Sequence, residues 1–159
     1  MPISPQPEQV HDPGGRPALD REWLVYLQHL GTAPGKRLQL WPPPGLHQAV
    51  DHFNSGRFFD SHESWEALWL ATEYPIRLFY LAMAKLTAGF EQAHRGKGAS
   101  ARRLAIDSLL YLDSFRPAFM GLDTERLCQD VGRWLSRPAA AAVPKRLWIT
   151  PASGAKARR

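Results

Sequence analysis

Apolar side chains recur at intervals of three and four residues along most of the chain, which is the spacing of a helix with one buried face. The pattern predicts six helical segments. They are one from Asp20 to Leu30, one from Leu46 to Phe53, one from Phe58 to Thr72, one that Pro75 opens and Gly96 ends, one whose apolar stripe runs from Ala101 to Phe115, and one that Asp123 or Thr124 caps. No segment alternates apolar and polar residues long enough for a strand. Short connections favour antiparallel neighbours, so we predict an all-α fold, a compact antiparallel helical bundle of about five to six helices.

Proline positions mark the boundaries of the predicted domain. Nine of the 14 prolines come before residue 45 and three come after residue 137. Because proline removes a backbone donor and fixes φ, it gathers where helices are absent. We therefore predict a flexible Pro-rich arm over residues 1–17, a single helical domain over 18–136 with a linker at 31–45, and a tail over 137–159.

The net charge of +5 comes from the predicted tail. Residues 137–159 hold six basic and no acidic side chains, while the rest of the chain is close to neutral. A basic tail can bind a polyanion by counterion release, although such tails more often only keep a terminus solvated. Nucleic acid is therefore an alternative partner rather than the leading one.

Cysteine usage and hydropathy suggest the compartment. The single cysteine, Cys128, allows no internal disulfide, which fits a reducing compartment. We find no signal-peptide pattern, and the longest apolar run, from Leu78 to Ala84, is too short to cross a bilayer. We expect a cytoplasmic protein that has no contact with a membrane, and we interpret Cys128 as a small buried apolar residue rather than a nucleophile.

The segment from Phe58 to Trp69 holds the candidate chemistry. On a helix, Phe58, His62, Trp65 and Trp69 share one face, which places His62 in an aromatic stripe that should point at the core. Two glutamates, Glu63 and Glu66, flank this stripe. Burying such polar groups without partners costs about 1–3 kcal/mol for a neutral group and more for a charge.

A buried polar network is the first interpretation of these residues. His62, Glu63 and Glu66 would pair with each other or with Arg77 and Lys85 of the next helix. The cluster, with Trp65 and Trp69 beside it, would then fix how the helices pack. On this interpretation, His62→Ala and Glu66→Ala should each lower the free energy of unfolding by roughly 2–4 kcal/mol.

A divalent metal site is the alternative. His62 and Glu66 stand at i and i+4 in an H-E-x-x-E pattern, and His47 and Asp51 of the preceding helix could add ligands. In that case Glu63 or Glu66 could be the general base of a metal-dependent hydrolase. The second histidine of H-E-x-x-H is missing, so we expect no cofactor as the leading interpretation.

Two other patterns carry weaker signals. Glu91-x-x-His94 resembles half of a carboxylate di-iron site, and the other such pair, Glu8-x-x-His11, falls in the Pro-rich arm. The basic loop over residues 94–103 precedes a predicted helix N-terminus, where a phosphate or a nucleic acid could bind. A solvated loop is the simpler interpretation of its basic side chains.

The sequence from Phe53 to Trp69 resembles the motif of a known family. Phe53-Asn54-x-Gly56-x-Phe58-Phe59-x-x-His62-Glu63-x-Trp65-Glu66-x-x-Trp69 is similar to the pattern of the domain-of-unknown-function 309 family of small helical proteins. The resemblance covers about residues 46–136, including Gly121-Leu122-Asp123, and it implies a compact helical bundle and no established activity.

The match departs from the family pattern downstream of the motif. Ala82, Lys85 and Gln92 stand where the family tends to carry glycine, glutamine and histidine, Gly96-Lys97 replaces Gly-Asn, and Ser100-Ala101 replaces Gly-Ala. A lysine at position 85 that faced Glu66 would form an ion pair and repel a cation. We therefore predict a non-enzymatic structural or interaction module, which could bind a protein partner or form a homo-oligomer.

Overall fold

The computed structural model describes residues 43–72, 76–137 and 149–152 of the 159-residue chain. Within these ranges the chain forms five α-helices and one short 3₁₀ helix. They are α2 (Leu46–Asn54), α3 (Phe58–Ala71), α4 (Arg77–His94), α5 (Gly98–Leu112), η2 (Asp113–Phe115) and α6 (Thr124–Leu135). None of the described segments is a strand, so the predicted all-α fold class is confirmed.

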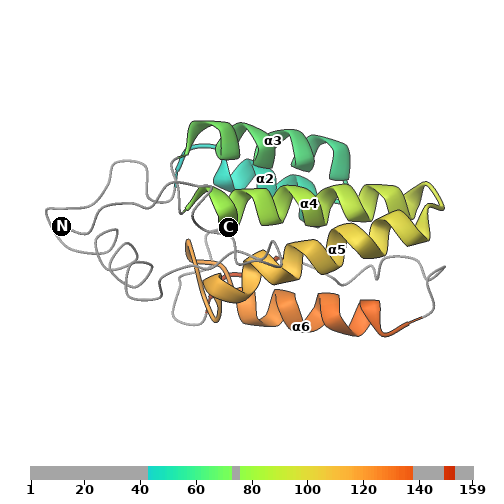
Figure 1. The fold of residues 1–159 in the computed structure, drawn as a ribbon. Coiled ribbons are helices and arrows are strands. Elements are labelled where there is room, and N and C mark those ends of the chain that lie inside the picture. The colour runs from blue at the N-terminus through green and yellow to red at the C-terminus, as the bar shows by residue number, and fades with distance from the viewer. Residues whose placement is uncertain (1–42, 73–75, 138–148, 153–159) are drawn as a thin grey trace, which may run out of the picture.

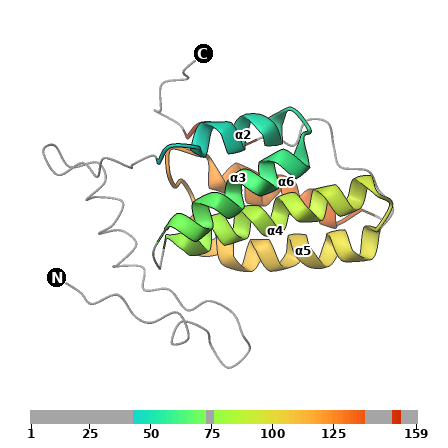
Figure 2. The same ribbon diagram turned by 90° about the horizontal axis from the view of Figure 1, so that it is seen from above.

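Helices that follow each other in sequence lie side by side (Figures 1 and 2). The helix α4 lies between α3 and α5, with which it makes the most extensive contacts of the described elements, and α2 packs against α3. The helix α6 lies beside α5 at the opposite side of the bundle from α3 (Figure 1). This order places α4 at the centre of the core, which explains why ten of its residues are buried.

Helix boundaries agree closely with the sequence prediction. The helix α2 extends one residue beyond the predicted Phe53, and α3 ends one residue before Thr72. The predicted fifth stripe continues to Phe115, as expected, but the helix tightens into η2 after Leu112. The predicted arm, the predicted helix from Asp20, the linker up to residue 42 and Pro75 lie outside the described residues.

The start of α6 shows how local sequence fixes a boundary. Asp123 is its N-cap, and the side-chain oxygen Oδ1 accepts a hydrogen bond from the backbone N–H of Arg126 at 2.9 Å. The hydroxyl of Thr124 instead donates to the carbonyl of Phe115 at 2.6 Å, which ties the helix to η2. Of the two predicted caps, Asp123 is therefore the cap and Thr124 is a buried tie between elements.

Aromatic rings fill the centre of the bundle. Phe79 of α4 is fully buried and contacts the rings of Trp65, Tyr80, Phe115 and Phe119, with centroid separations between 5.1 and 6.3 Å. These separations are typical of favourable edge-to-face and tilted ring pairs. The rings belong to α3, α4, η2 and the loop before α6, so this cluster joins these four parts of the described domain.

The contact between α4 and α5 is close because one position has no side chain. A Cβ atom placed on Gly89 would lie 3.0 Å from the carbonyl oxygen of Ala101 and 3.3 Å from the Cβ of Leu104. Glycine therefore allows the two backbones to approach at this crossing. The sequence pattern gave no reason to single out Gly89.

Part of the predicted basic tail packs against the domain. Ile149 is 3% exposed, and residues 149–152 make hydrogen bonds to Asn54, Gly121 and Asp123. The prediction that the tail is only a solvated arm therefore does not hold for these four residues. The composition of the tail did not indicate this packed segment, because the basic residues of the tail lie on both sides of the segment.

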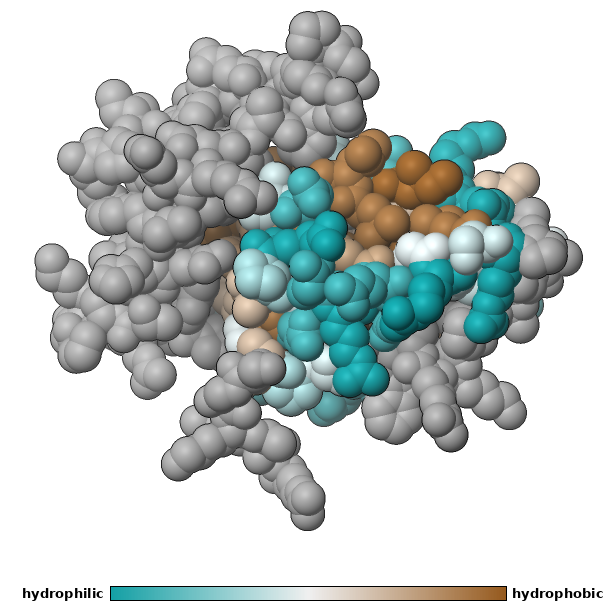
Figure 3. Space-filling view, turned by 90° about the horizontal axis from the view of Figure 1, so that it is seen from below, coloured by the Kyte–Doolittle hydropathy of each residue, from teal (hydrophilic) through white to brown (hydrophobic). Residues whose placement is uncertain are grey.

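The surface of the described helices is mostly polar, with a few large apolar exceptions. Figure 3 shows an apolar patch beside hydrophilic residues on the face seen from below. The large exposed apolar side chains are Phe59, Leu70, Ile106 and Leu110. None of the described helices combines the length and the apolar character that crossing a membrane requires.

Candidate functional site

The orientation of α3 decides where the H-E-x-x-E residues lie. Its buried positions are Phe58, Ser61, Trp65 and Leu68, which are spaced by three, four and three residues. The hydroxyl of Ser61 donates to the carbonyl of Ala49 at 2.8 Å, so this small polar residue is satisfied inside the contact with α2. The buried face is therefore centred between Ser61 and Trp65 rather than on His62.

This orientation moves the polar residues to the surface. His62 is partly buried, whereas Glu63 and Glu66 are both exposed. Trp69, at the edge of the same face, is partly buried and packs against the core. The expected burial of the cluster thus does not hold for the two glutamates, because Ser61, not His62, faces α2.

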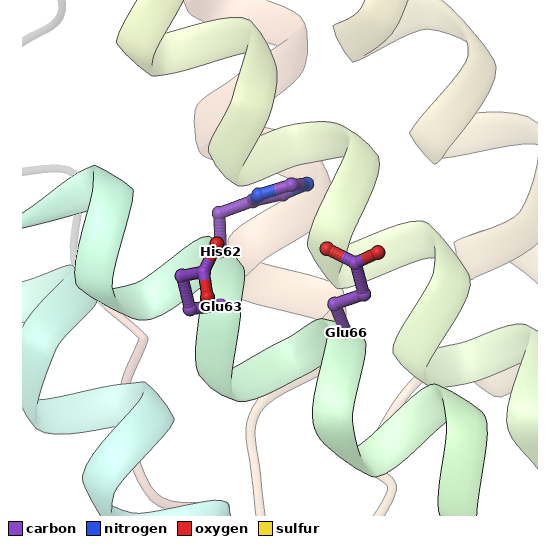
Figure 4. A group of neighbouring side chains, drawn as sticks. All are labelled: His62, Glu63 and Glu66. Atoms are coloured by element: carbon purple, nitrogen blue, oxygen red, sulfur yellow. The ribbon is translucent and has the colours of Figure 1, made fainter.

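His62, Glu63 and Glu66 form a compact group of potential metal ligands. One ligand atom from each residue can be chosen so that all three lie within 4.8 Å of one another. Figure 4 shows His62 and Glu63 side by side on one turn of α3 and Glu66 on the next turn, with the His62 ring and the Glu66 carboxylate extending toward the same side. The described residues contain this group as their sole cluster of three or more such ligands.

The basic residues expected to neutralise the glutamates have other partners. The Nζ atom of Lys85 lies 3.4 Å from Oδ2 of Asp107 on α5, so the predicted pair with Glu66 is replaced by one with Asp107. The guanidinium of Arg77 lies over the Trp69 ring, 4.8 Å from its centroid, in a cation–π arrangement. Among the described residues, no ion pair includes Glu63 or Glu66.

The additional ligands predicted on α2 and α4 do not join the group. His47 and Asp51 are exposed on α2 and are not members of the His62 cluster. Glu91 pairs with Arg95 at 2.8 Å, and the ring of His94 packs edge-on against Phe58 at 5.0 Å. The second predicted half of a di-iron site, at Glu8 and His11, lies outside the described residues.

The predicted basic loop connects α4 to α5. His94, Arg95, Lys97 and Arg103 are exposed, as the interpretation of a solvated loop expects. Arg102 is partly buried, and its guanidinium donates to the carbonyl of Arg137 at 3.1 Å. Arg95 is already engaged by Glu91, so part of the positive charge of this loop is balanced within the chain.

Cys128 lies on the buried side of α6, 7% exposed, in agreement with the sequence interpretation. Burial raises the pKa of its thiol from 9.0 to about 11, and the nearby Arg116 opposes this rise only in part. The folded thiol holds its proton more tightly than the unfolded one. Its contribution to stability is therefore complete below pH 9.0 and is lost as the pH rises through about 11.

We expect Cys128 to be a slow thiol in the folded protein. At pH 8 the thiolate fraction should be about a hundredth of that of a thiol with the ordinary pKa, and labelling by a thiol reagent should slow at least in that proportion. The measurement compares labelling rates of the native and urea-unfolded chain, whose single cysteine makes the signal unambiguous. Equal rates in the two states would show that the thiol is accessible and ordinary.

Sequence reasoning missed two polar residues with structural roles. Ser61 was passed over because it is polar, although the spacing from Phe58 through Ser61, Trp65 and Leu68 is regular and would have identified the buried face. Asn54 enters the sequence analysis only as a position of the motif, whereas its side chain makes two hydrogen bonds to Ile149. No local signal could have revealed the second contact, because its partners are separated by 95 residues.

Comparison with models of protein families supports the resemblance that the motif on α3 indicates. No curated protein and no solved structure matches the chain. The matched family segment covers all of α2, α3 and α4 and the first half of α5, and it is shorter than the predicted extent of about 46–136. Residues 46–104 match the model of the family described as Domain of unknown function (DUF309), which confirms the resemblance predicted from the motif.

Proposed function

We propose that this domain is a non-enzymatic interaction module that binds a divalent cation through His62, Glu63 and Glu66. The observation that carries the proposal is the convergence of their three ligand atoms within 4.8 Å on the surface of one helix. Both carboxylates are exposed and have no basic partner among the described residues. Their negative charge is therefore available to a cation.

The spacing of the group is compatible with a shared ion. Two ligands of one zinc-sized ion lie about 3–4 Å apart, so small rotations of the exposed glutamate side chains would bring all three atoms into contact with it. One imidazole and two carboxylates favour a first-row transition ion over Mg²⁺ or Ca²⁺, which prefer oxygen ligands alone. Three protein ligands leave coordination positions free for water or for a partner.

The position of Lys85 supports cation binding in this chain. A lysine ammonium beside Glu66 would have competed with a metal ion for the carboxylate. Instead, the Nζ atom of Lys85 lies 3.4 Å from the carboxylate of Asp107, so its positive charge faces α5. The exposed setting of the group suits an ion whose free positions are completed by a ligand approaching from solvent, and we confine the proposal to binding.

The test is titration of the purified full-length chain with Zn²⁺ by calorimetry. We expect one binding event, and we expect His62→Ala and Glu66→Ala each to weaken it at least about tenfold, since losing one of three ligands should cost at least about 1.4 kcal/mol of binding free energy. The double variant His47→Ala/Asp51→Ala is the matched control. It removes an exposed histidine and carboxylate at the same helical spacing, and it should leave binding unchanged.

Two results would contradict the proposal. One is the absence of heat above the control, and the other is equal loss of binding in the His47/Asp51 variant. Thermal melts of the metal-free proteins accompany the titration, because the exposed Glu66→Ala change should alter the free energy of unfolding by no more than about 0.5 kcal/mol. A larger change would restore the buried-network interpretation.

A further inference from the structure

The exposed face of α3 carries a pattern that is symmetric about its midpoint. Phe59, Glu63, Glu66 and Leu70 are all exposed and follow one another at intervals of four, three and four residues, which places them in one stripe along the helix. The two apolar ends are 59% and 69% exposed. We call these four residues the outer stripe. It lies opposite the buried face of α3, which runs along the upper edge of the bundle in Figure 1.

A stripe with this symmetry matches a second copy of itself. Two copies of α3 can pack antiparallel about a two-fold axis that passes midway between Glu63 and Glu66. Phe59 of each copy then lies level with the partner's Leu70, about 8 Å along the helix from the midpoint, and Glu63 lies level with the partner's Glu66. Apolar side chains meet apolar side chains at both ends. An unrelated partner would not require this symmetry, so the pattern favours a second copy.

The middle of such a pair requires cations. Among the described residues neither Glu63 nor Glu66 has an ion-pair partner, so the glutamates of two copies would repel each other. Other carboxylates on the described helices have an arginine or lysine partner: Asp60, Glu91, Asp107, Asp113, Glu125 and Asp130. One divalent cation per copy cancels the charge of the two glutamates of that copy. Its open positions face the carboxylates of the partner, which can complete its coordination.

A hollow in the surface lies at the Phe59 end of the outer stripe. It is open, has a volume of about 340 Å³ and is lined by residues that include Arg57, Phe58, Phe59 and His94. In the antiparallel arrangement the partner's Leu70 arrives at this end. The aromatic rings and the apolar stem of Arg57 offer it a surface against which to bury. The hollow therefore gives each exposed leucine a place in the other copy.

From these observations we propose that α3 is the interface of a cation-dependent antiparallel homodimer, in which the outer stripes of two copies pack on each other with the cations between them. The inference rests on the cation site proposed above at His62, Glu63 and Glu66. Stable interfaces bury at least about 1,200 Å², and two large apolar side chains per copy fall short of that area. The chain should therefore be monomeric without the cation and associate when the cation is bound.

Sedimentation velocity of the purified full-length chain, with and without Zn²⁺, tests this proposal. We expect a 17.9 kDa monomer in the metal-free protein, a dimer once each chain has bound Zn²⁺, and a return to monomer when a chelator removes the metal. The double variant Phe59→Ser/Leu70→Ser should still bind Zn²⁺ in calorimetry. Its dimer should dissociate at least about tenfold more readily, because the apolar contacts at both ends are lost.

The matched control is Ile106→Ser/Leu110→Ser, which removes two large exposed apolar side chains from α5 instead. All four positions are exposed, so both double variants should fold like the parent, and the control should dimerise like it. Equal weakening by the control would contradict the assignment to α3. A chain that binds Zn²⁺ but stays monomeric up to about 1 mM would overturn the dimer and leave the cation site standing. A chain that binds no Zn²⁺ in calorimetry would remove the cation site and the dimer with it.

Discussion

Replacing Trp65 with alanine is expected to lower the free energy of unfolding by about 3–5 kcal/mol, which is the usual cost of truncating a fully buried large aromatic side chain. Trp65 is 0% exposed and lies between α3 and α4, with its ring at 6.3 Å from those of both Phe79 and Tyr80. Its removal leaves a cavity where α3 packs against α4. Urea unfolding followed by circular dichroism measures the change.

Trp65→Phe is the control for this prediction. The indole N–H has no hydrogen-bond partner among the described residues, so phenylalanine loses ring volume but no hydrogen bond. We therefore expect a cost clearly smaller than that of alanine. A Trp65→Ala protein that unfolds at the same urea concentration as the parent would show that α3 does not pack on α4 as described.

A methyl group at position 89 should destabilise the protein even though alanine is the better helix former. The Cβ of Gly89→Ala would meet the backbone of Ala101 at 3.0 Å, and that oxygen belongs to α5 and cannot rotate away. Overpacking of this kind costs about 1–3 kcal/mol. Alanine contributes up to about 1 kcal/mol of helix propensity in return, so we expect a net loss of stability on thermal or urea unfolding.

Gly132 offers the opposite case in the same chain. It lies in α6, it is exposed, and a Cβ placed there would have no heavy atom within 4 Å. Gly132→Ala should therefore stabilise the protein by about 0.5–1 kcal/mol through helix propensity alone. The two variants together are decisive because the same glycine-to-alanine change should lower the stability of the protein at position 89 and raise it at position 132. If both variants gain stability, the close approach of α4 and α5 at Gly89 is absent.

Helix positions were predictable from sequence because each one rests on short-range information. The three-and-four spacing of Phe79, Met83, Leu86 and Phe90 identified the buried face of α4, and all four are fully buried. The cap at Asp123 followed from the chemistry of its side chain. Contacts between distant segments leave no such trace, which is why Gly89 against Ala101 was not foreseen.

The composition of the candidate site was predictable, and its environment was not. The motif placed His62, Glu63 and Glu66 together on one helix, and helical geometry alone brings their ligand atoms close. Whether they face the core depends on which neighbouring position tolerates the closest approach of α2. That position is Ser61, since its hydroxyl bonds to Ala49, and when Ser61 rather than His62 faces α2 both glutamates are exposed.

The clamp between Asn54 and Ile149 constrains how related sequences can vary. Asparagine at position 54 is needed only while a backbone segment presents both its N–H and its carbonyl to the side chain. Natural variants that lose the apolar residue at position 149 should therefore also lose the asparagine, and the two positions should covary although they lie 95 residues apart. Such covariation would show that related chains share this contact, and with it the fold, well beyond residue 104, where the family match ends.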